Sequence, residues 1–206
     1  MDEKRLAVAK AVLEKIEEKR KASGKAYFVV AIDGRCGAGK TTLAADIRNL
    51  CDCQVLPMDH FFLRPEQRTK ERLTCPGGNV DYERFEEEVL KVLGREEELY
   101  YRPYSCREQK LAEPIKINRT PLIVVEGSYS CHPALRSYYD MKIFLTVGKQ
   151  EQLKRIERRN GQEGLSIFRE KWIPLEEQYF EACKVEKICD IRINTDILQE
   201  KQIEIS

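Results

Sequence analysis

The sequence GRCGAGKT at residues 34–41 restricts the fold of this chain more than any other stretch. It matches the pattern G-x-x-x-x-G-K-[ST], a glycine-rich turn whose backbone N–H groups surround a phosphate. An apolar stretch at residues 26–33 precedes it, and a helical pattern at residues 40–50 follows it. A strand, this turn and a helix in succession bring N–H groups and the positive end of the helix to one anion. The alternative is a plain glycine turn before an ordinary helix, with Lys40 exposed to solvent.

The residues from Gly34 to Thr42 are therefore the expected binding site for a nucleoside triphosphate. We expect Lys40 to reach the β- and γ-phosphates and the Thr41 hydroxyl to bind Mg²⁺. Cys36 is incidental to phosphate binding, although a thiol in this loop is a candidate for oxidation. The guanine-specific pattern N-K-x-D is absent, which argues against a GTPase switch and leaves ATP as the expected nucleotide. The expected nucleotide-binding residues are Gly34, Arg35, Cys36, Gly37, Ala38, Gly39, Lys40, Thr41 and Thr42.

Apolar stretches alternate with helical patterns along most of the chain. Short apolar runs rich in β-branched and aromatic residues predict strands buried on both faces of a sheet. Residues 59–80 predict an irregular loop, and residues 100–118 predict a hairpin excursion. The expected strands are residues 26–33, 53–58, 121–127, 141–147 and 188–195, and the expected helices lie at residues 1–24, 40–50, 81–94, 149–161 and 166–185.

This order of elements predicts an α/β fold of the P-loop NTPase type. We expect three α/β/α layers, a mostly parallel central sheet and a small lid and hairpin excursion. The chain has 206 residues, a length that suits a single domain with a leading helix at residues 1–24 and a core at residues 26–195. The expected buried face of the leading helix consists of Leu6, Ala9, Val12, Leu13 and Ile16.

The charge balance limits the kinds of partner. Lys and Arg number 36 against 35 Asp and Glu, so we expect no bulk attraction to nucleic acid or to an acidic membrane. Apolar runs fall far short of the roughly 20 residues of a membrane helix, and residues 1–20 are too acidic for a targeting peptide. We therefore expect a cytoplasmic protein with a small-molecule substrate, and a homo-oligomer is left open. The eight cysteines lack zinc-site spacings, and we expect most of them to be reduced core residues.

Two acidic residues follow predicted strands at positions that suit phosphate transfer. Transfer to a hydroxyl requires a carboxylate near the acceptor oxygen and a second acidic group that organises a metal ion. Asp59 follows the strand at residues 53–58, and Glu126 lies at the end of the strand at residues 121–127. Because parallel strands present ligands at their carboxyl ends, we expect both side chains beside the phosphate loop. The alternatives are a loop-entry cap at Asp59 and a turn residue at Glu126.

Several short stretches occur in the order found in one family of enzymes. They are GRCGAGKTT, MDHFF, GGNVDYERF, YRPYSCREQ, VVEGSYSCHPALRSYYDMKIFLTV and LKRIERR. Over residues 26–195 the chain resembles uridine kinase-like, phosphoribulokinase-related P-loop kinases. The resemblance implies that Asp59 is the general base on a nucleoside 5′-hydroxyl and helps to hold Mg²⁺. It also implies that Glu126 organises the metal together with Thr41.

The same resemblance implies residues that bind the acceptor. Asp81 would bind the ribose hydroxyls, although its position also suits the N-cap of a helix. Tyr104 would line the nucleobase pocket; the alternative is a core residue of the hairpin. Gln109 stands where uridine kinases place a pyrimidine-contacting histidine, and Phe62 replaces a tyrosine near the sugar. Gln109 can still donate and accept hydrogen bonds at a base edge, so the identity of the acceptor stays open.

Arginines in the stretch LKRIERR match residues that close over the transferred phosphate. Arg155 and Arg158 are one helical turn apart and share a face, and their guanidinium groups suit a phosphoryl group. Arg159 and Lys154 are substitutes in the same role, and a solvated charged face is the alternative. The lid is expected to be short, because RRNGQEG turns where the family carries further arginines.

The sequence thus predicts an ATP- and Mg²⁺-dependent kinase of a small molecule, with the 5′-hydroxyl of a nucleoside such as uridine or cytidine as the expected acceptor. One alternative is a P-loop kinase for another metabolite, such as pantothenate. A second is a nucleotide-binding regulatory protein without phosphotransfer. A third, an ATPase that binds nucleic acid, conflicts with the balanced charge.

Overall fold

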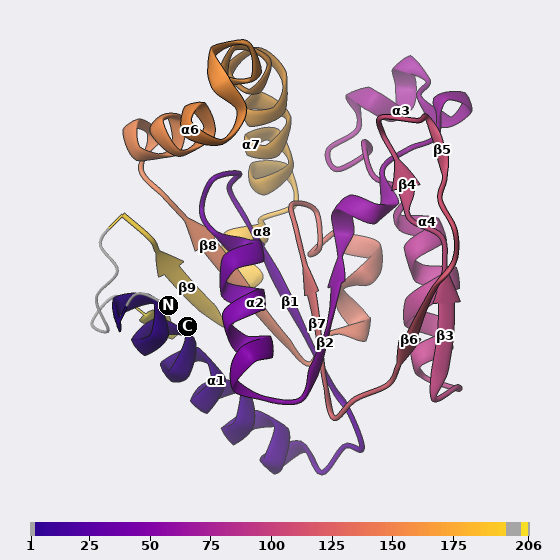
Figure 1. The fold of residues 1–206 in the computed structure, drawn as a ribbon, viewed down its shortest axis with the longest axis vertical. Coiled ribbons are helices and arrows are strands. Elements are labelled where there is room, and N and C mark those ends of the chain that lie inside the picture. The colour runs from indigo at the N-terminus through magenta and orange to yellow at the C-terminus, as the bar shows by residue number, and fades with distance from the viewer. Residues whose placement is uncertain (1–2, 197–202, 206) are drawn as a thin grey trace.

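A six-stranded sheet forms the centre of the computed structural model, which describes residues 3–196 and 203–205 (Figure 1). Its strands lie in the order β10-β9-β8-β1-β7-β2. The parallel strands are β1 (Phe28–Gly34), β2 (Cys53–Pro57), β7 (Leu122–Glu126), β8 (Met141–Thr146) and β9 (Ile191–Asn194), and β10 (Ile203–Ile205) pairs with β9 in the antiparallel sense. The mostly parallel sheet predicted from the sequence is confirmed.

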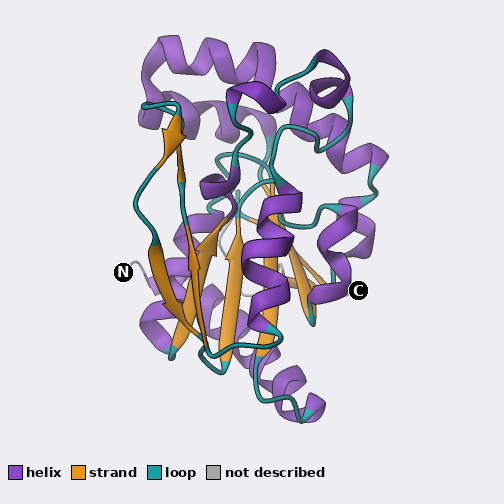
Figure 2. Cartoon of the chain, turned by 90° about the vertical axis from the view of Figure 1, so that its right-hand side faces the viewer, coloured by secondary structure: helices purple, strands orange, loops and turns teal. Residues whose placement is uncertain are grey.

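Strand β1 lies inside the sheet because both of its faces are apolar. Val29 and Ala31 pack into one core, whereas Val30 and Ile32 pack into the core on the opposite face. The second core is covered by α1 (Glu3–Ser23) and α2 (Lys40–Leu50), and the first by α4 (Tyr82–Phe85), α5 (Lys91–Leu93), α7 (Ile173–Ala182) and α8 (Val185–Ile188). Helices therefore cover both faces of the sheet (Figure 2), as expected for three α/β/α layers.

Two excursions leave this core. One is an antiparallel ribbon in which β3 (Glu98–Tyr101) pairs with β6 (Ile115–Asn118) and β4 (Tyr104–Ser105) pairs with β5 (Lys110–Leu111). The other is α6 (Lys149–Ile167), which is kinked at Gly161 (φ 70°, ψ −179°) and continues through a π turn (Phe168–Trp172) into α7. In Figure 1, α6 and α7 lie near the same end of the molecule as β4, β5 and α3 (Lys70–Thr74). Short 3₁₀ turns occur at Met58–Phe61, Pro65–Gln67 and Pro133–Tyr138.

Some local expectations are corrected. In α1 the buried residues are Val8, Ala9, Val12 and Ile16, whereas Leu6 and Leu13 are half-buried. The reason is the helical period: residues four apart from Val8 face the sheet, and Leu6 and Leu13 lie at the margins of that face.

The helix expected at residues 81–94 contains a π turn (Glu86–Leu90) between α4 and α5. Strand β10 was not expected from the sequence. Four of the eight cysteines are buried, which is fewer than the expected majority. Within the described residues, no helix combines the length and the apolar character needed to cross a membrane.

Candidate active site

The loop between β1 and α2 has the backbone shape that a phosphate cradle needs. Gly37 and Gly39 have φ of 76° and 92°, a region that glycine adopts without steric cost. A Cβ atom on Gly34 would lie 2.0 Å from the carbonyl oxygen of Leu145, so only glycine fits beside β8 at this position. The glycines therefore serve the turn itself and its close contact with the sheet.

Several carbonyl groups of the loop are bound by side chains, and several of its N–H groups form no hydrogen bond among the described residues. Side chains of α6 bind two of the carbonyls: Gln152 Nε2 donates to the oxygen of Cys36 at 3.0 Å, and Arg155 Nη1 donates to the oxygen of Gly37 at 3.3 Å. Converging free N–H groups at a helix N-terminus form an anion site. The loop N–H groups that form no hydrogen bond among the described residues are those of Gly37, Gly39, Lys40, Thr41 and Thr42.

Lys40 and a carboxylate from α7 meet at the tip of the loop. Lys40 Nζ donates to the oxygens of Gly34 (2.6 Å) and Arg35 (3.1 Å) and to Ser128 Oγ (3.1 Å). Ser128 Oγ in turn donates to Glu176 Oε1 at 2.6 Å, and Glu176 Oε2 accepts from the N–H of Cys36 at 2.9 Å. Glu176 therefore binds a loop N–H group that a phosphate oxygen could otherwise use.

The Cys36 thiol is buried against this carboxylate. Burial and the charge of Glu176 raise the pKa of the thiol far above its ordinary range. Because the thiolate is the reactive form, the expected susceptibility of Cys36 to oxidation finds no support in its surroundings.

Oxygen atoms suited to a hard cation lie on the other side of the loop. Thr41 Oγ1 is 3.0 Å and 3.2 Å from the two carboxylate oxygens of Glu126. Burial raises the pKa of Glu126, and the nearby negative charge of Asp59 raises it further. Hydroxyl and carboxylate oxygens are the ligands that Mg²⁺ prefers, and a divalent cation would relieve the repulsion between the two carboxylates. The residues Thr41, Asp59 and Glu126 therefore fit a magnesium ion.

A cavity of ≈ 900 Å³ joins these groups. Asp59 lines the cavity and is exposed, and its side chain forms no hydrogen bond or ion pair with another described residue. Gly34 and Arg35 do not line the cavity; Arg35 instead pairs with Glu177 at 2.7 Å. The cavity brings together the predicted residues Cys36, Gly37, Ala38, Gly39, Lys40, Thr41, Thr42, Asp59, Phe62, Glu126, Arg155 and Arg158.

The lid arginines differ from one another in their contacts. Arg155 is fixed by Glu151 Oε1 at 2.9 Å and by the carbonyl oxygen of Thr195 at 2.8 Å, so it links the loop carbonyl of Gly37 to the residue that follows β9. Arg158 is exposed, lines the cavity and forms no ion pair among the described residues. Arg159 also lines the cavity, whereas Lys154 does not. Arg159 Nε donates to Asn160 Oδ1 at 2.8 Å and its guanidinium carbon lies 5.5 Å from the centre of the Phe168 ring, so Arg158 is the cavity arginine of this stretch without such a partner among the described residues.

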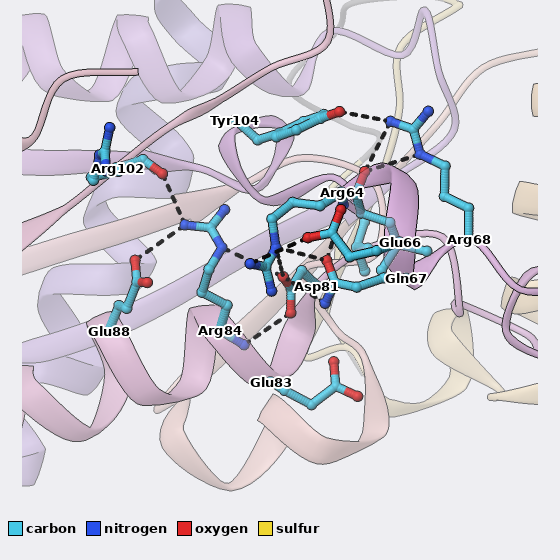
Figure 3. Close-up of polar contacts among 12 residues, drawn as sticks. Arg64, Glu66, Gln67, Arg68, Asp81, Glu83, Arg84, Glu88, Arg102 and Tyr104 are labelled. Carbon is cyan, nitrogen blue, oxygen red and sulfur yellow. Dashed lines mark hydrogen bonds and ion pairs between the residues drawn. The ribbon is translucent and has the colours of Figure 1, made fainter. Parts of the chain in front are cut away.

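Asp81 does not line the cavity and is 2% exposed. Its Oδ1 accepts from the N–H of Arg84 at 3.2 Å, which is the N-cap contact of α4. Its Oδ2 accepts from Gln67 Nε2 at 3.0 Å and lies 3.5 Å from Arg84 Nε. Figure 3 shows this carboxylate enclosed by side chains of the chain itself. The contacts of Asp81 are therefore those of the alternative interpretation, in which Asp81 is the N-cap of a helix.

Tyr104 and Gln109 form a second cluster outside the cavity lining. Arg68 donates to Gln109 Oε1 and to the Tyr104 hydroxyl, both at 3.1 Å, and its guanidinium carbon lies 5.7 Å from the centre of the Tyr104 ring. Figure 3 shows Arg68 directed at Tyr104. Gln109 Nε2 donates to the carbonyl oxygen of Cys106 at 2.5 Å, so both ends of its amide are engaged.

Several cavity residues were not expected from the sequence. Ser128 and Tyr129 come two and three residues after Glu126 at the carboxyl edge of the sheet, a position that could have identified them. Glu176 lies on the same side of α7 as buried Phe180. An acidic residue on an apolar helix face is unusual, so the sequence pattern could have identified Glu176 as a candidate site residue. Asn79 carried no such signal.

Asp33, at the end of β1, holds the turn after β7 in place. Its carboxylate accepts hydrogen bonds from the N–H groups of Gly34 (2.7 Å), Tyr129 (3.2 Å) and Cys131 (2.8 Å) and from the Tyr179 hydroxyl (2.9 Å). Burial raises the pKa of Asp33 to about 6. One buried carboxylate therefore joins the phosphate loop, this turn and α7.

Asp33→Asn is expected to lower the free energy of unfolding by about 2 kcal/mol at pH 7. The reason is that the side-chain NH2 group of asparagine is itself a donor and would meet the N–H and O–H donors that bind the Asp33 carboxylate. Since the raised pKa makes the folded protein bind a proton more tightly, the wild type loses stability as the pH rises from about 4 to about 6, and the variant lacks this loss. Urea unfolding across this pH range measures both effects. Exposed Asp52→Asn is the control, and equal stability of Asp33→Asn and wild type would contradict the role of Asp33.

Glu176→Ala is expected to tighten ATP binding by about fivefold, the worth of one hydrogen bond of ~1 kcal/mol, because the N–H of Cys36 is freed and a negative charge is removed. Calorimetric titration with ATP measures the change. The control is Glu181→Ala, an exposed position on the same helix. Weaker ATP binding by Glu176→Ala would show that the carboxylate supports the nucleotide instead of competing with it.

No protein-family model matches the chain, but solved structures resemble it. A possible uridine kinase from Bacillus stearothermophilus is 17% identical, with a TM-score of 0.62 over 88% of this chain and 98% of that chain. A protein from Silicibacter sp. TM1040, provisionally described as a fructose transport system kinase, is 21% identical, with a TM-score of 0.64 over 86% and 94%. YFH7 from Saccharomyces cerevisiae, provisionally described as a P-loop containing kinase with a circular permutation, is 12% identical, with a TM-score of 0.64 over 92% and 98%.

The chain has the fold of P-loop kinases. At these sequence identities the similarity shows the fold and does not show the activity or the substrate. The names of these proteins point to different substrates, so they do not select an acceptor for this chain.

Proposed function

We propose that this protein transfers the γ-phosphoryl group of ATP to a hydroxyl group of a small molecule. The observation that carries the proposal is a free carboxylate, Asp59, in the same cavity as Lys40 and the free N–H groups of the phosphate loop. Such a reaction needs a binding site for the phosphate donor and a general base in the same place. A single domain in the cytoplasm, without nucleic-acid partners, belongs to the same proposal.

The residues of the chain would divide the work of the reaction. The loop N–H groups and Lys40 bind the triphosphate, and Lys40 must leave Ser128 and the loop carbonyls to do so. Asp59 takes the proton of the acceptor hydroxyl, while Arg158 stabilises the phosphoryl oxygens. Mg²⁺, held by Thr41, Asp59 and Glu126, would neutralise charge on the β- and γ-phosphates. Positioning of the two substrates and electrostatic stabilisation of the phosphoryl group would therefore supply the acceleration of the transfer.

The 5′-hydroxyl of a nucleoside such as uridine or cytidine is the first acceptor to test, because the resemblance to uridine kinase-like enzymes runs through residues 26–195. Another metabolite, of the pantothenate type, is the second candidate. It is favoured by the engaged amide of Gln109 and by the enclosed carboxylate of Asp81, which leave neither group free for a base or a ribose.

The test is an assay with ATP, Mg²⁺ and a panel of uridine, cytidine, D-ribose, D-glycerate and pantothenate, with the products identified by mass. Only acceptors that bind the native protein also raise its thermal midpoint. A phosphorylated product supports the proposal and names the acceptor. ATP binding without a product from any acceptor favours a regulatory protein, and strong salt-dependent binding to single-stranded DNA would favour an ATPase acting on nucleic acid.

A further inference from the structure

Two buried polar groups in the cavity have no hydrogen-bond partner. Among the described residues, the buried side-chain atoms without a partner are Asn79 Nδ2, Arg84 Nε, the Tyr129 hydroxyl and the Tyr139 hydroxyl. Asn79 and Tyr129 line the cavity, whereas Arg84 and Tyr139 do not. Asn79 is 8% exposed and Tyr129 is 3% exposed. An unpaired buried polar group is costly, so a bound ligand is the natural partner for such groups on residues that line a cavity.

The two groups lie side by side and act as donors. The Asn79 amide is close enough to the Tyr129 hydroxyl to lower its pKa, yet the two do not form a hydrogen bond of ordinary geometry. Burial and the charge of Glu176 outweigh this effect and raise the pKa of Tyr129 far above its ordinary range. The hydroxyl therefore stays protonated, and two neighbouring neutral donors belong to residues that line the same cavity.

The backbone at Tyr129 is held in an unusual conformation. Its φ of 74° lies in the left-handed region, which bulky residues rarely adopt. Asp33 Oδ1 accepts from its N–H at 3.2 Å, and its ring packs on that of Tyr179 with centroids 4.9 Å apart. Strain of this kind persists where the surroundings enforce it, often at functional sites. Here it fixes the ring whose hydroxyl has no partner of its own.

Asn79 belongs to the side of the cavity that carries the expected general base. An isolated antiparallel bridge joins Phe62 to Val80, the residue next to Asn79. Phe62 and Asp59 both line the cavity. The segment of Asn79 is therefore tied to the segment of Asp59, while the Tyr129 hydroxyl is also close to the charge of Glu176.

We propose that Asn79 and Tyr129 bind the phosphate acceptor of this enzyme, by donating hydrogen bonds to an oxygen atom near the hydroxyl that is phosphorylated. This deepens the proposed phosphotransferase function and rests on it. The acceptor class is an oxygen-rich small molecule, a polyol or hydroxy acid, that presents a second hydroxyl, carbonyl or carboxylate oxygen beside the reacting one. Asp81, Tyr104 and Gln109 are not part of this contact.

The test compares Tyr129→Phe and Asn79→Ala with wild type on the acceptor identified by the panel above. Each is expected to raise the KM for the acceptor about tenfold, the equivalent of 1.4 kcal/mol, and to change the Kd for ATP less than twofold. Tyr139→Phe is the matched control, because it removes an equally buried and unpartnered hydroxyl outside the cavity. The control should leave both constants unchanged. Circular dichroism and thermal midpoints establish that each variant folds.

The outcomes separate this inference from the function on which it rests. An unchanged KM for the acceptor in both variants overturns the inference and leaves the kinase intact. A rise in the Kd for ATP with an unchanged KM for the acceptor also overturns it, because the pair then contacts the phosphoryl group. Absence of a product from wild type with every acceptor overturns the proposed function itself. If Tyr104→Phe and Gln109→Ala raise the KM while the cavity pair leaves it unchanged, recognition lies outside the cavity and the inference fails.

Discussion

Asp59→Asn is expected to lower kcat by about 10²–10⁴-fold, the usual contribution of a general base, while the Kd for ATP changes little. The amide keeps the shape of the side chain but cannot take the proton of the acceptor hydroxyl. The Asp59 side chain forms no hydrogen bond or ion pair with another described residue, so the substitution should leave the stability of the fold unchanged. Steady-state rates with the panel acceptor measure the effect.

The control for this variant is again Asp52→Asn, an exposed carboxyl after α2 and outside the cavity. Wild-type turnover by Asp59→Asn would remove Asp59 from the reaction. Glu126, whose buried carboxylate contacts Thr41, would then be the remaining acidic candidate.

Lys40→Ala is expected to weaken ATP binding at least tenfold and to reduce turnover by about 10³-fold, because a charged donor to the β- and γ-phosphates is lost. The side chain is 8% exposed and its ammonium group binds two loop carbonyls and Ser128. We therefore also expect a loss of stability of about 1–3 kcal/mol from the unpaired carbonyls.

Titration calorimetry, turnover and urea unfolding separate these effects of Lys40→Ala. Lys154→Ala is the matched control, since Lys154 is exposed on α6 and does not line the cavity. Unchanged nucleotide affinity together with unchanged turnover would count against the phosphate loop as the donor site.

The nucleotide side of the site follows from short-range sequence patterns. The residues from Gly34 to Thr42 are contiguous, and their function depends on local backbone conformation that glycine, lysine and threonine encode directly. Asp59 and Glu126 could be placed beside them because the ends of parallel strands meet at one edge of a sheet, and Pro57 and Glu126 indeed pair in register.

The acceptor side could not be predicted in this way, because competing partners come from distant parts of the chain. Gln109 stands where uridine kinases place a pyrimidine-contacting histidine, but Arg68, 41 residues away, engages its amide. Asp81 is likewise bound by Gln67, 14 residues away. Glu176 reaches the phosphate loop across a separation of 140 residues. Sequence spacing carries no information about contacts of this range.

The sequence by itself therefore determined the layered α/β fold and the phosphate loop that opens α2, since both depend on apolar periodicity and on residues a few positions apart. The tertiary structure decided which polar groups are free. Asp81, Tyr104 and Gln109 are bound by the chain itself, whereas Asn79 and Tyr129 lack partners inside the cavity. The physical reason is that a polar side chain can bind a ligand only when folding has left its donors or acceptors unused.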